Sequence, residues 1–298
     1  MRSPIFTLLF CFFSSLSFAQ VELESERDED GNVIFYATNA ASIPYAVLFN
    51  FSNLNNLTTP GGSTPLVVAN PGRTPVLRLR PSREGQATSY RYSYSYSKGN
   101  MLAKIKEDPV YLIPVADGQM VRAMQMTHIE NQLQPKEYNS NYVGVSFHFE
   151  TPTVIVAPRK GVISDMRMSY EAKEGEFRYD GKDNFIEIYH EDGTFTKLAV
   201  LKKDSQKVEL GDEVFPGQEL ALSAGENYSS GTHVRMSTFK SVKKDRDKLG
   251  YDLIPVQFIT EGGAIEIPKL VELEVIHPQE IIELEMSKRE KKKYFADK

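Results

Sequence analysis

Alternating hydrophobic and polar positions dominate the chain from residue 20 to about residue 100. The segments NVIFYATNA, PYAVLFNFS, PVLRLRP and SYRYSYSYS alternate in this way or are rich in β-branched and aromatic residues. Because successive side chains of a β-strand point to opposite faces, the pattern predicts strands with one buried face. The clusters NAAS, TTPGGST and NPGRT between them are typical of turns. Residues 20–100 are therefore predicted to form a small antiparallel β-sandwich.

A second series of predicted strands occupies residues 101–245. Its members are PTVIVAP, GVISDMRMS, NFIEIYH, TFTKLAVL and ELALSA, joined by turn sequences such as EDGT and ELGDEVFPGQ. Almost none of this region has a helical period, so the fold class is predicted to be all-β.

Residues 246–298 begin with further strand candidates and end in PQEIIELEMSKREKKKYFADK, the one segment with a helical period. We expect this lysine-rich tail to be a solvated, frayed helix. The alternative is an electrostatic contact with an acidic partner or envelope surface.

The first nineteen residues, MRSPIFTLLFCFFSSLSFA, combine one basic residue, a long apolar centre and small residues before Gln20. This is the pattern of a secretory signal peptide cleaved after Ala19, which predicts an exported protein, periplasmic or extracellular. No later segment is apolar enough to span a membrane.

The cysteine content and the net charge limit the classes of function that we expect. The single cysteine, Cys11, lies in the predicted signal peptide, so the remaining chain has no disulfide and depends on core packing. Removing Arg2 with that segment changes the formal net charge from -5 to -6. An acidic chain is not expected to bind nucleic acid.

The run SYRYSYSY allows two interpretations. Alternating tyrosines could stack against sugars or bases. They could equally cover one sheet face against a neighbouring element, which is the reading we favour.

Several motifs occur in a fixed order between residues 109 and 240: APRKGVIS, NFIEIYHEDGT, AVL, VELGDEVFPGQ and SSGTHVRMSTF. Their order and spacing resemble the lysostaphin-type zinc endopeptidases, which cut the peptides of bacterial peptidoglycan and have the duplicated hybrid motif fold. The resemblance implies a groove-forming antiparallel β-sheet domain. The sandwich-like region before it resembles a module that precedes this domain in some exported members.

The positions that hold zinc in that family are replaced here. The family motif H-x-G-x-D matches YVGVSF, which puts Tyr142 at a histidine ligand and Ser146 at the aspartate. No histidine lies between His128 and His148. In the family motif A-H-L the catalytic histidine becomes Val200. In H-x-H the first histidine is kept as His233, and the second becomes Arg235.

These replacements predict a degenerate member without zinc. Arginine stays protonated and offers no lone pair, and a neutral serine cannot balance a dication. Valine can neither bind a metal nor transfer a proton. A zinc site with unusual ligands remains the alternative, since His148 could point the same way as Ser146 on one strand. His190 matches a family histidine that has no ligand role.

His233 and Arg235 each have two interpretations. His233 is expected to be a structural, hydrogen-bonded residue of the groove, with ligand contact as the alternative. Arg235 could receive a ligand carboxylate as a bidentate partner. It could also fill the former metal position and pair with a nearby glutamate.

The function predicted from these residues is that of an inactive, exported peptidase-like protein. It would bind a peptidoglycan stem peptide or regulate a wall hydrolase, with Tyr142, Ser146, His148, His233 and Arg235 as groove candidates and no cofactor. The alternatives are an active zinc endopeptidase of peptidoglycan and a purely structural envelope protein.

Overall fold

The protein is nearly all β, as the alternation predicted. The computed structural model describes residues 20–106, 109–127, 142–171, 183–225, 228 and 230–296. Among the strands named there, β8 and β19 form the one parallel pair, and the other pairs are antiparallel. None of the helices in the described ranges is long and apolar enough to cross a membrane.

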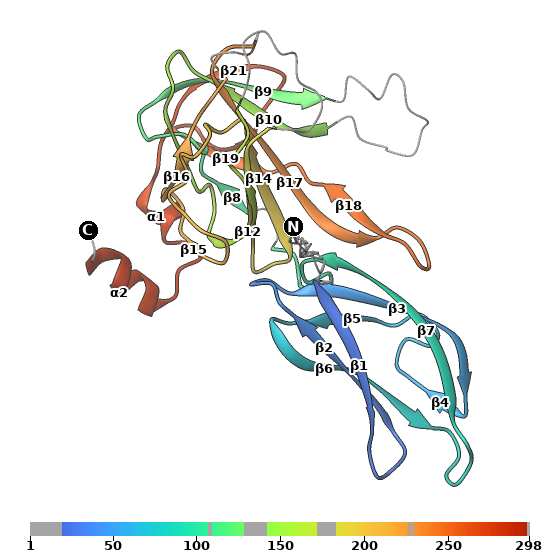
Figure 1. Cartoon of the computed structure of the whole chain (residues 1–298). Coiled ribbons are helices and arrows are strands. Elements are labelled where there is room, and N and C mark those ends of the chain that lie inside the picture. The colour runs from blue at the N-terminus through green and yellow to red at the C-terminus, as the bar shows by residue number, and fades with distance from the viewer. Residues whose placement is uncertain are drawn as a thin grey trace, which may run out of the picture.

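Residues 21–98 form two facing antiparallel sheets, drawn in blue to green in Figure 1. The first has the order β1 (Val21–Arg27), β2 (Val33–Asn39), β6 (Gly72–Pro81), β4 (Leu57–Thr58). The second has the order β5 (Leu66–Ala69), β3 (Tyr45–Asn55), β7 (Ser89–Lys98). Between them lies an aromatic core in which Phe35, Phe49 and Phe51 are buried. The predicted sandwich is confirmed.

The tyrosines of β7 face this core. The rings of Tyr90 and Tyr92 pack edge-on against Phe35, with centroids at 5.6 and 5.0 Å. Tyr90 also hydrogen-bonds Ser25 of β1 through its hydroxyl group at 2.8 Å. These contacts confirm the interpretation of the tyrosine run as a packed sheet face, although Tyr94 and Tyr96 remain 37% and 38% exposed.

A nine-stranded antiparallel sheet forms the larger part of the molecule (Figure 1). Its order is β15 (Glu213–Val214), β12 (Gly161–Arg167), β13 (Phe185–Tyr189), β14 (Thr194–Ala199), β17 (His233–Lys243), β10 (Tyr142–His148), β9 (Met120–Thr127), β21 (Val271–Glu274), with β18 (Leu249–Leu253) paired to β17. Strands from both sides of residue 245 thus share one sheet. The predicted domain boundaries stay predictions.

Two smaller sheets accompany it. One pairs β11 (Val154–Val156) with β16 (Glu219–Leu222), and the other has the order β20 (Gly263–Glu266), β19 (Gln257–Thr260), β8 (Val110–Tyr111). A single cluster of buried residues, with Phe147, Ile186, Leu198 and Phe258 among them, fills the space that these sheets enclose.

The sandwich is joined to the large sheet by apolar and charged contacts. Tyr189 and Phe195 of the large sheet belong to the sandwich core. Lys98, the last residue of β7, lies 2.6 Å from Asp165 and 2.9 Å from Glu187. Burial alone would lower the pKa of Lys98, but these two carboxylates raise it above its ordinary value. Lys98 therefore stays charged and links the two parts.

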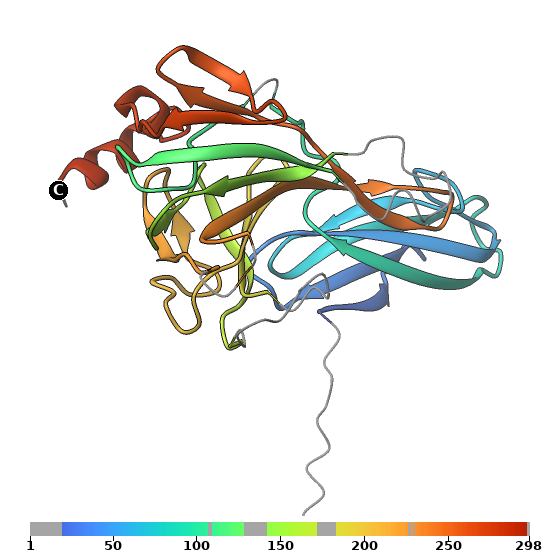
Figure 2. The ribbon, with the colours of Figure 1, turned by 90° about the horizontal axis from the view of Figure 1, so that it is seen from above.

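The tail folds as the helices α1 (Gln279–Ile282) and α2 (Lys288–Ala296), which confirms its helical pattern. The expectation of a solvated, frayed tail was wrong for residues 279–286, whereas none of residues 288–294 in α2 is buried. Ile282 and Met286 are buried, and Glu285 accepts two hydrogen bonds from Arg159 at 2.7 and 2.8 Å. The apolar residues are evident in the sequence, but the surface against which they pack could not be predicted from it. Figure 2 shows the tail and the sandwich at opposite ends of the molecule.

Candidate functional site

Three strands bring most of the candidate residues together at the middle of the large sheet. Ser146 and His148 of β10 lie directly opposite Arg235 and His233 of β17. On the other side of β17, Ala199 of β14 is opposite Arg235, and Val200 follows it. Residues two apart on a strand share a face. Strand pairing therefore puts these side chains next to one another, except for that of Val200, which lies just beyond the end of β14. Tyr142 belongs to β10, but its side chain lies outside the described residues.

His148 and His233 form a stacked pair, with ring centroids 5.0 Å apart and an angle of 16° between the rings. The Nδ1 atom of His148 is 3.2 Å from the Ser230 carbonyl, and that of His233 is 2.6 Å from the Gly231 carbonyl. A carbonyl only accepts, so each Nδ1 donates and each Nε2 keeps a lone pair.

The two Nε2 atoms have different surroundings. His148 Nε2 accepts from the Ser146 hydroxyl at 3.0 Å. His233 Nε2 is buried and has no hydrogen-bond partner among the described residues. Burial is the main cause that lowers the pKa of His233, to about 4; the Gly231 hydrogen bond opposes the shift and the Arg235 charge adds to it. Burial also lowers the pKa of His148. Both rings are therefore neutral at pH 7.

Arg235 forms an internal ion pair. Its Nη1 atom lies 3.5 Å from Asp183, and its guanidinium lies 5.8 Å from the centre of the Tyr228 ring. The Tyr228 hydroxyl donates to the same carboxylate. Of the two interpretations from sequence, the internal pair is the one present, with an aspartate in place of the expected glutamate.

Sequence reasoning missed Asp183 and Tyr228. Asp183 precedes β13, which is separated from β17 by β14, so no local pattern links it to Arg235. Tyr228 lies in the loop before β17, at a place where the family motif is dominated by small residues.

Val200 adopts a left-handed backbone conformation with φ of 70° and is buried. For a β-branched residue this conformation is a steric outlier. Its amide donates to the Asn184 carbonyl at 3.1 Å, which holds the chain in this turn. The position that matches the family's catalytic histidine is thus a strained point at the end of β14.

Two cavities border the cluster formed by Ser146, His148, Val200, His233 and Arg235. The larger, about 450 Å³, reaches His148 and Ser230 and is also lined by Arg122, Glu150 and Glu272. The smaller, about 330 Å³, is lined by residues of the Arg235 side of the cluster: Tyr170, Glu171, Asp183, Asn184, Val200, Leu201, Lys202, Lys203, Ala224 and Tyr228.

Arg122 extends the cluster across the sheet. It lies opposite His148 on one side and opposite Glu272 on the other. Since His148 is opposite His233, the residues Glu272, Arg122, His148 and His233 form one polar row over β21, β9, β10 and β17.

The donor set does not fit zinc. Protein zinc sites need thiolate, imidazole or carboxylate ligands that converge on one ion at about 2.0–2.3 Å. The His148 and His233 rings are nearly parallel, so their in-plane lone pairs do not converge. Asp183 is already occupied by Arg235 and Tyr228. Within the described ranges, no group of three or more His, Cys, Asp or Glu could hold a metal ion.

His190 lies apart from this cluster. It is fully buried, with Nδ1 at 2.7 Å from the Lys160 carbonyl and Nε2 at 2.8 Å from the Thr196 hydroxyl. Both ring nitrogens are satisfied, so His190 has a structural role.

No protein-family model matches the chain, and a search of curated proteins found no match. Among solved structures, a chain of the SpoIIQ–SpoIIIAH pore-forming complex is 18% identical, with a TM-score of 0.32 over 49% of this chain and 89% of that one. The M23 metalloprotease pseudoalterin from the deep sea is 14% identical, with a TM-score of 0.31 over 54% and 97%. A zinc-containing peptidase from Vibrio cholerae is 12% identical, with a TM-score of 0.27 over 77% and 83%. Superpositions of this quality decide neither the fold nor the function of this chain.

Proposed function

We propose that this protein is an exported, catalytically inactive relative of the lysostaphin-type endopeptidases. Its groove would bind a peptide, either a stem peptide of peptidoglycan or a segment of a wall hydrolase, without cutting it.

One observation supports this proposal above the others. Ser146, Val200 and the pair His233 and Arg235 come from three separate stretches of the sequence and were singled out by motif order, yet they meet at one place in the sheet. At that place an ion pair between Arg235 and Asp183 stands where the family chemistry needs a metal and its water. A groove of this kind retains a binding surface but lacks an activated nucleophile.

The charges beside His148 indicate the ligand chemistry. Arg122 is exposed in the larger cavity, whereas Arg235 is engaged by Asp183. Glu150 and Glu272 line the same cavity. A peptide with a free carboxylate and a free amine would match this arrangement, because arginine binds carboxylates bidentately and the glutamates attract ammonium groups. Arg122, not Arg235, is therefore the proposed carboxylate-binding residue.

Elemental analysis and peptidoglycan digestion test the loss of catalysis. We expect the purified protein to contain no stoichiometric zinc and to release no fragments from peptidoglycan, with or without added zinc. About one zinc per chain, together with turnover that a chelator abolishes and zinc restores, would contradict the proposal.

Calorimetric titration with soluble stem-peptide fragments tests the binding. Arg122→Ala is expected to weaken binding about tenfold or more, as is typical of a lost charge-assisted hydrogen bond. Lys203→Ala is the control, since Lys203 borders the other cavity. Equal binding by the wild type and Arg122→Ala would remove Arg122 from the site.

A further inference from the structure

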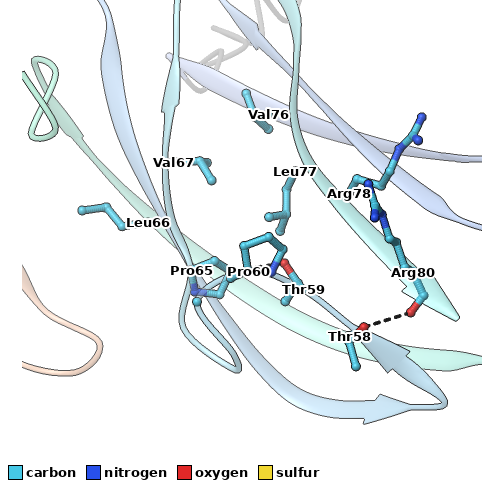
Figure 3. Close-up of a pocket in the computed structure, with 11 residues that line it drawn as sticks. Thr58, Thr59, Pro60, Pro65, Leu66, Val67, Val76, Leu77, Arg78 and Arg80 are labelled. Atoms are coloured by element: carbon cyan, nitrogen blue, oxygen red, sulfur yellow. Dashed lines mark hydrogen bonds between the residues drawn. The ribbon is translucent and has the colours of Figure 1, made fainter. Parts of the chain in front are cut away.

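A cavity in the N-terminal sandwich lies away from the residues of the candidate site. It has a volume of about 620 Å³ and opens between the two sheets (Figure 3). Leu66 and Val67 of β5 line one side, and Val76 and Leu77 of β6 line the other. Thr58, Thr59, Pro60 and Gly61 close one end. Apolar side chains of both sheets are therefore accessible at this opening.

Two strand edges border the opening. Along one side β6 pairs with β2 from Gly72 to Leu79, but on its other side it pairs with β4 only at Arg80 and Pro81. β5 is the end strand of its sheet and pairs only with β3 among the described strands. An edge strand offers unpaired backbone donors and acceptors, to which an extended chain can add.

The side chains of β6 alternate in a way that specifies such an added strand. Leu77 and Leu79 are buried, while Arg78 and Arg80 are exposed and also border the cavity. Arg78 makes one long ion pair, 3.8 Å from Asp28, and no ion pair of Arg80 occurs within the described residues. A neighbouring strand would place its own side chains directly opposite these, about 4.5–5.5 Å away between Cβ atoms.

We infer that this edge is a docking site for an extended peptide segment of a partner protein in which apolar and acidic residues alternate. The apolar residues would enter the cavity against Val67 and Leu77, and the acidic residues would lie opposite Arg78 and Arg80. Charge complementarity selects this occupant, because a basic strand would face two arginines. The site is independent of the groove and of its proposed function.

The direct test uses a fluorescein-labelled heptapeptide of sequence EVEVEVE, measured by fluorescence anisotropy against the purified protein. We expect saturable binding. The double variant Arg78→Glu, Arg80→Glu should weaken it about tenfold or more, because attraction at two cross-strand pairs becomes repulsion. Arg91→Glu, on the outer face of β7, is the matched control with the same change of charge and should bind like the wild type.

Two further peptides separate strand addition from simple charge attraction. A peptide of the same composition without alternation, EEEEVVV, and an EVEVEVE peptide methylated on alternate backbone amides should both bind at least tenfold more weakly. The first cannot match the pleat, and the second lacks the edge hydrogen bonds. Hydrogen exchange should show slower exchange in residues 72–79 on binding of EVEVEVE.

Several outcomes would overturn the inference. No saturable binding would mean that Arg78, Arg80 and Pro75 merely protect an edge strand. Equal binding of EEEEVVV or of the methylated peptide would reduce the interaction to charge alone. Equal loss in Arg91→Glu would remove the edge of β6 as its location. Concentration-dependent self-association that the double variant abolishes, without peptide binding, would identify a second copy of this chain as the occupant.

Discussion

At the residue scale, the charge of Arg235 determines how the cluster is built. A guanidinium in a half-buried position needs a counter-charge, and Asp183 supplies it with help from the Tyr228 hydroxyl. The same positive charge disfavours protonation of His233. The ion pair and the neutral histidine pair thus support each other, and neither arrangement requires a metal.

Arg235→Ala is expected to lower the free energy of unfolding by about 1–3 kcal/mol, because Asp183 is left partly buried without its cation. Arg235→Lys should recover part of the loss. Denaturant unfolding measures both. Lys203→Ala, which removes an exposed ion pair with Glu171, should change stability little. If Arg235→Ala is as stable as Lys203→Ala, the ion pair makes no net contribution.

Because of His233, we expect the free energy of unfolding to fall in mild acid. Its pKa is about 4 in the folded protein and 6.5 ordinarily, so the unfolded chain binds a proton more readily. The contribution of His233 to the free energy of unfolding is complete above pH 6.5. It falls by about 3 kcal/mol as the pH is lowered towards 4. His233→Gln should therefore show a shallower decline of unfolding free energy over this range. Parallel curves for the two proteins would show that His233 titrates normally.

At the scale of elements, the C-terminal tail is held by one buried ion network. Arg159 is 3.0 Å from Asp192 and 2.7 Å from Glu285, and its side chain is 4% exposed. Lys160 adds a contact to Glu290 of α2 at 2.6 Å. Arg159 and Lys160 directly precede β12, so the tail is attached to the large sheet.

Glu285→Ala is expected to destabilise the protein by about 3 kcal/mol, because a buried arginine loses one of its carboxylates. Glu283→Ala removes the ion pair with Lys291 at the surface and should have little effect. Denaturant unfolding and the rate of proteolysis within residues 279–296 measure the difference. Equal stability of the two variants would show that the tail is held by apolar contacts alone.

At the scale of the whole molecule, the sandwich and the large sheet share a core. Phe195 of β14 stacks on Phe239 of β17 with centroids 5.1 Å apart, and Phe195 also belongs to the sandwich core. Gly99, directly after β7, approaches this ring closely. A Cβ at Gly99 would lie 2.7 Å from Phe195 Cε2. We therefore expect the two parts to unfold together.

Gly99→Ala tests this coupling. Alanine at φ of 88° strains the backbone and also collides with the Phe195 ring. Gly85→Ala is the matched control, because Gly85 has a φ of 69° but nothing within 4 Å of its Cβ position. The control should lose about 1 kcal/mol from strain alone. Calorimetry should show a larger loss for Gly99→Ala and separation of the single transition into two. Equal losses would mean that the ring moves aside without cost.

Local patterns in the sequence were enough to predict the strands and their faces, and motif order singled out the positions that meet in the large sheet. The alternation of PVLRLRP separates Leu77 and Leu79 from Arg78 and Arg80, and the spacing of His233 and Arg235 puts both on one face of β17. Such information is local, because the strand period of two depends only on neighbouring residues. It also sufficed to predict the sandwich and the all-β class.

Which residues became partners depended on how the strands are ordered and packed. Arg235 could have met a ligand or a carboxylate of its own chain until the order β13, β14, β17 brought Asp183 within 3.5 Å. The tail had a helical pattern, but whether Ile282 and Met286 would be solvated depended on a surface formed by residues more than one hundred positions earlier, such as Arg159. The cavity beside β6 likewise exists because two separate sheets leave an edge uncovered. Contacts of this kind depend on strand order and packing, which no local pattern encodes.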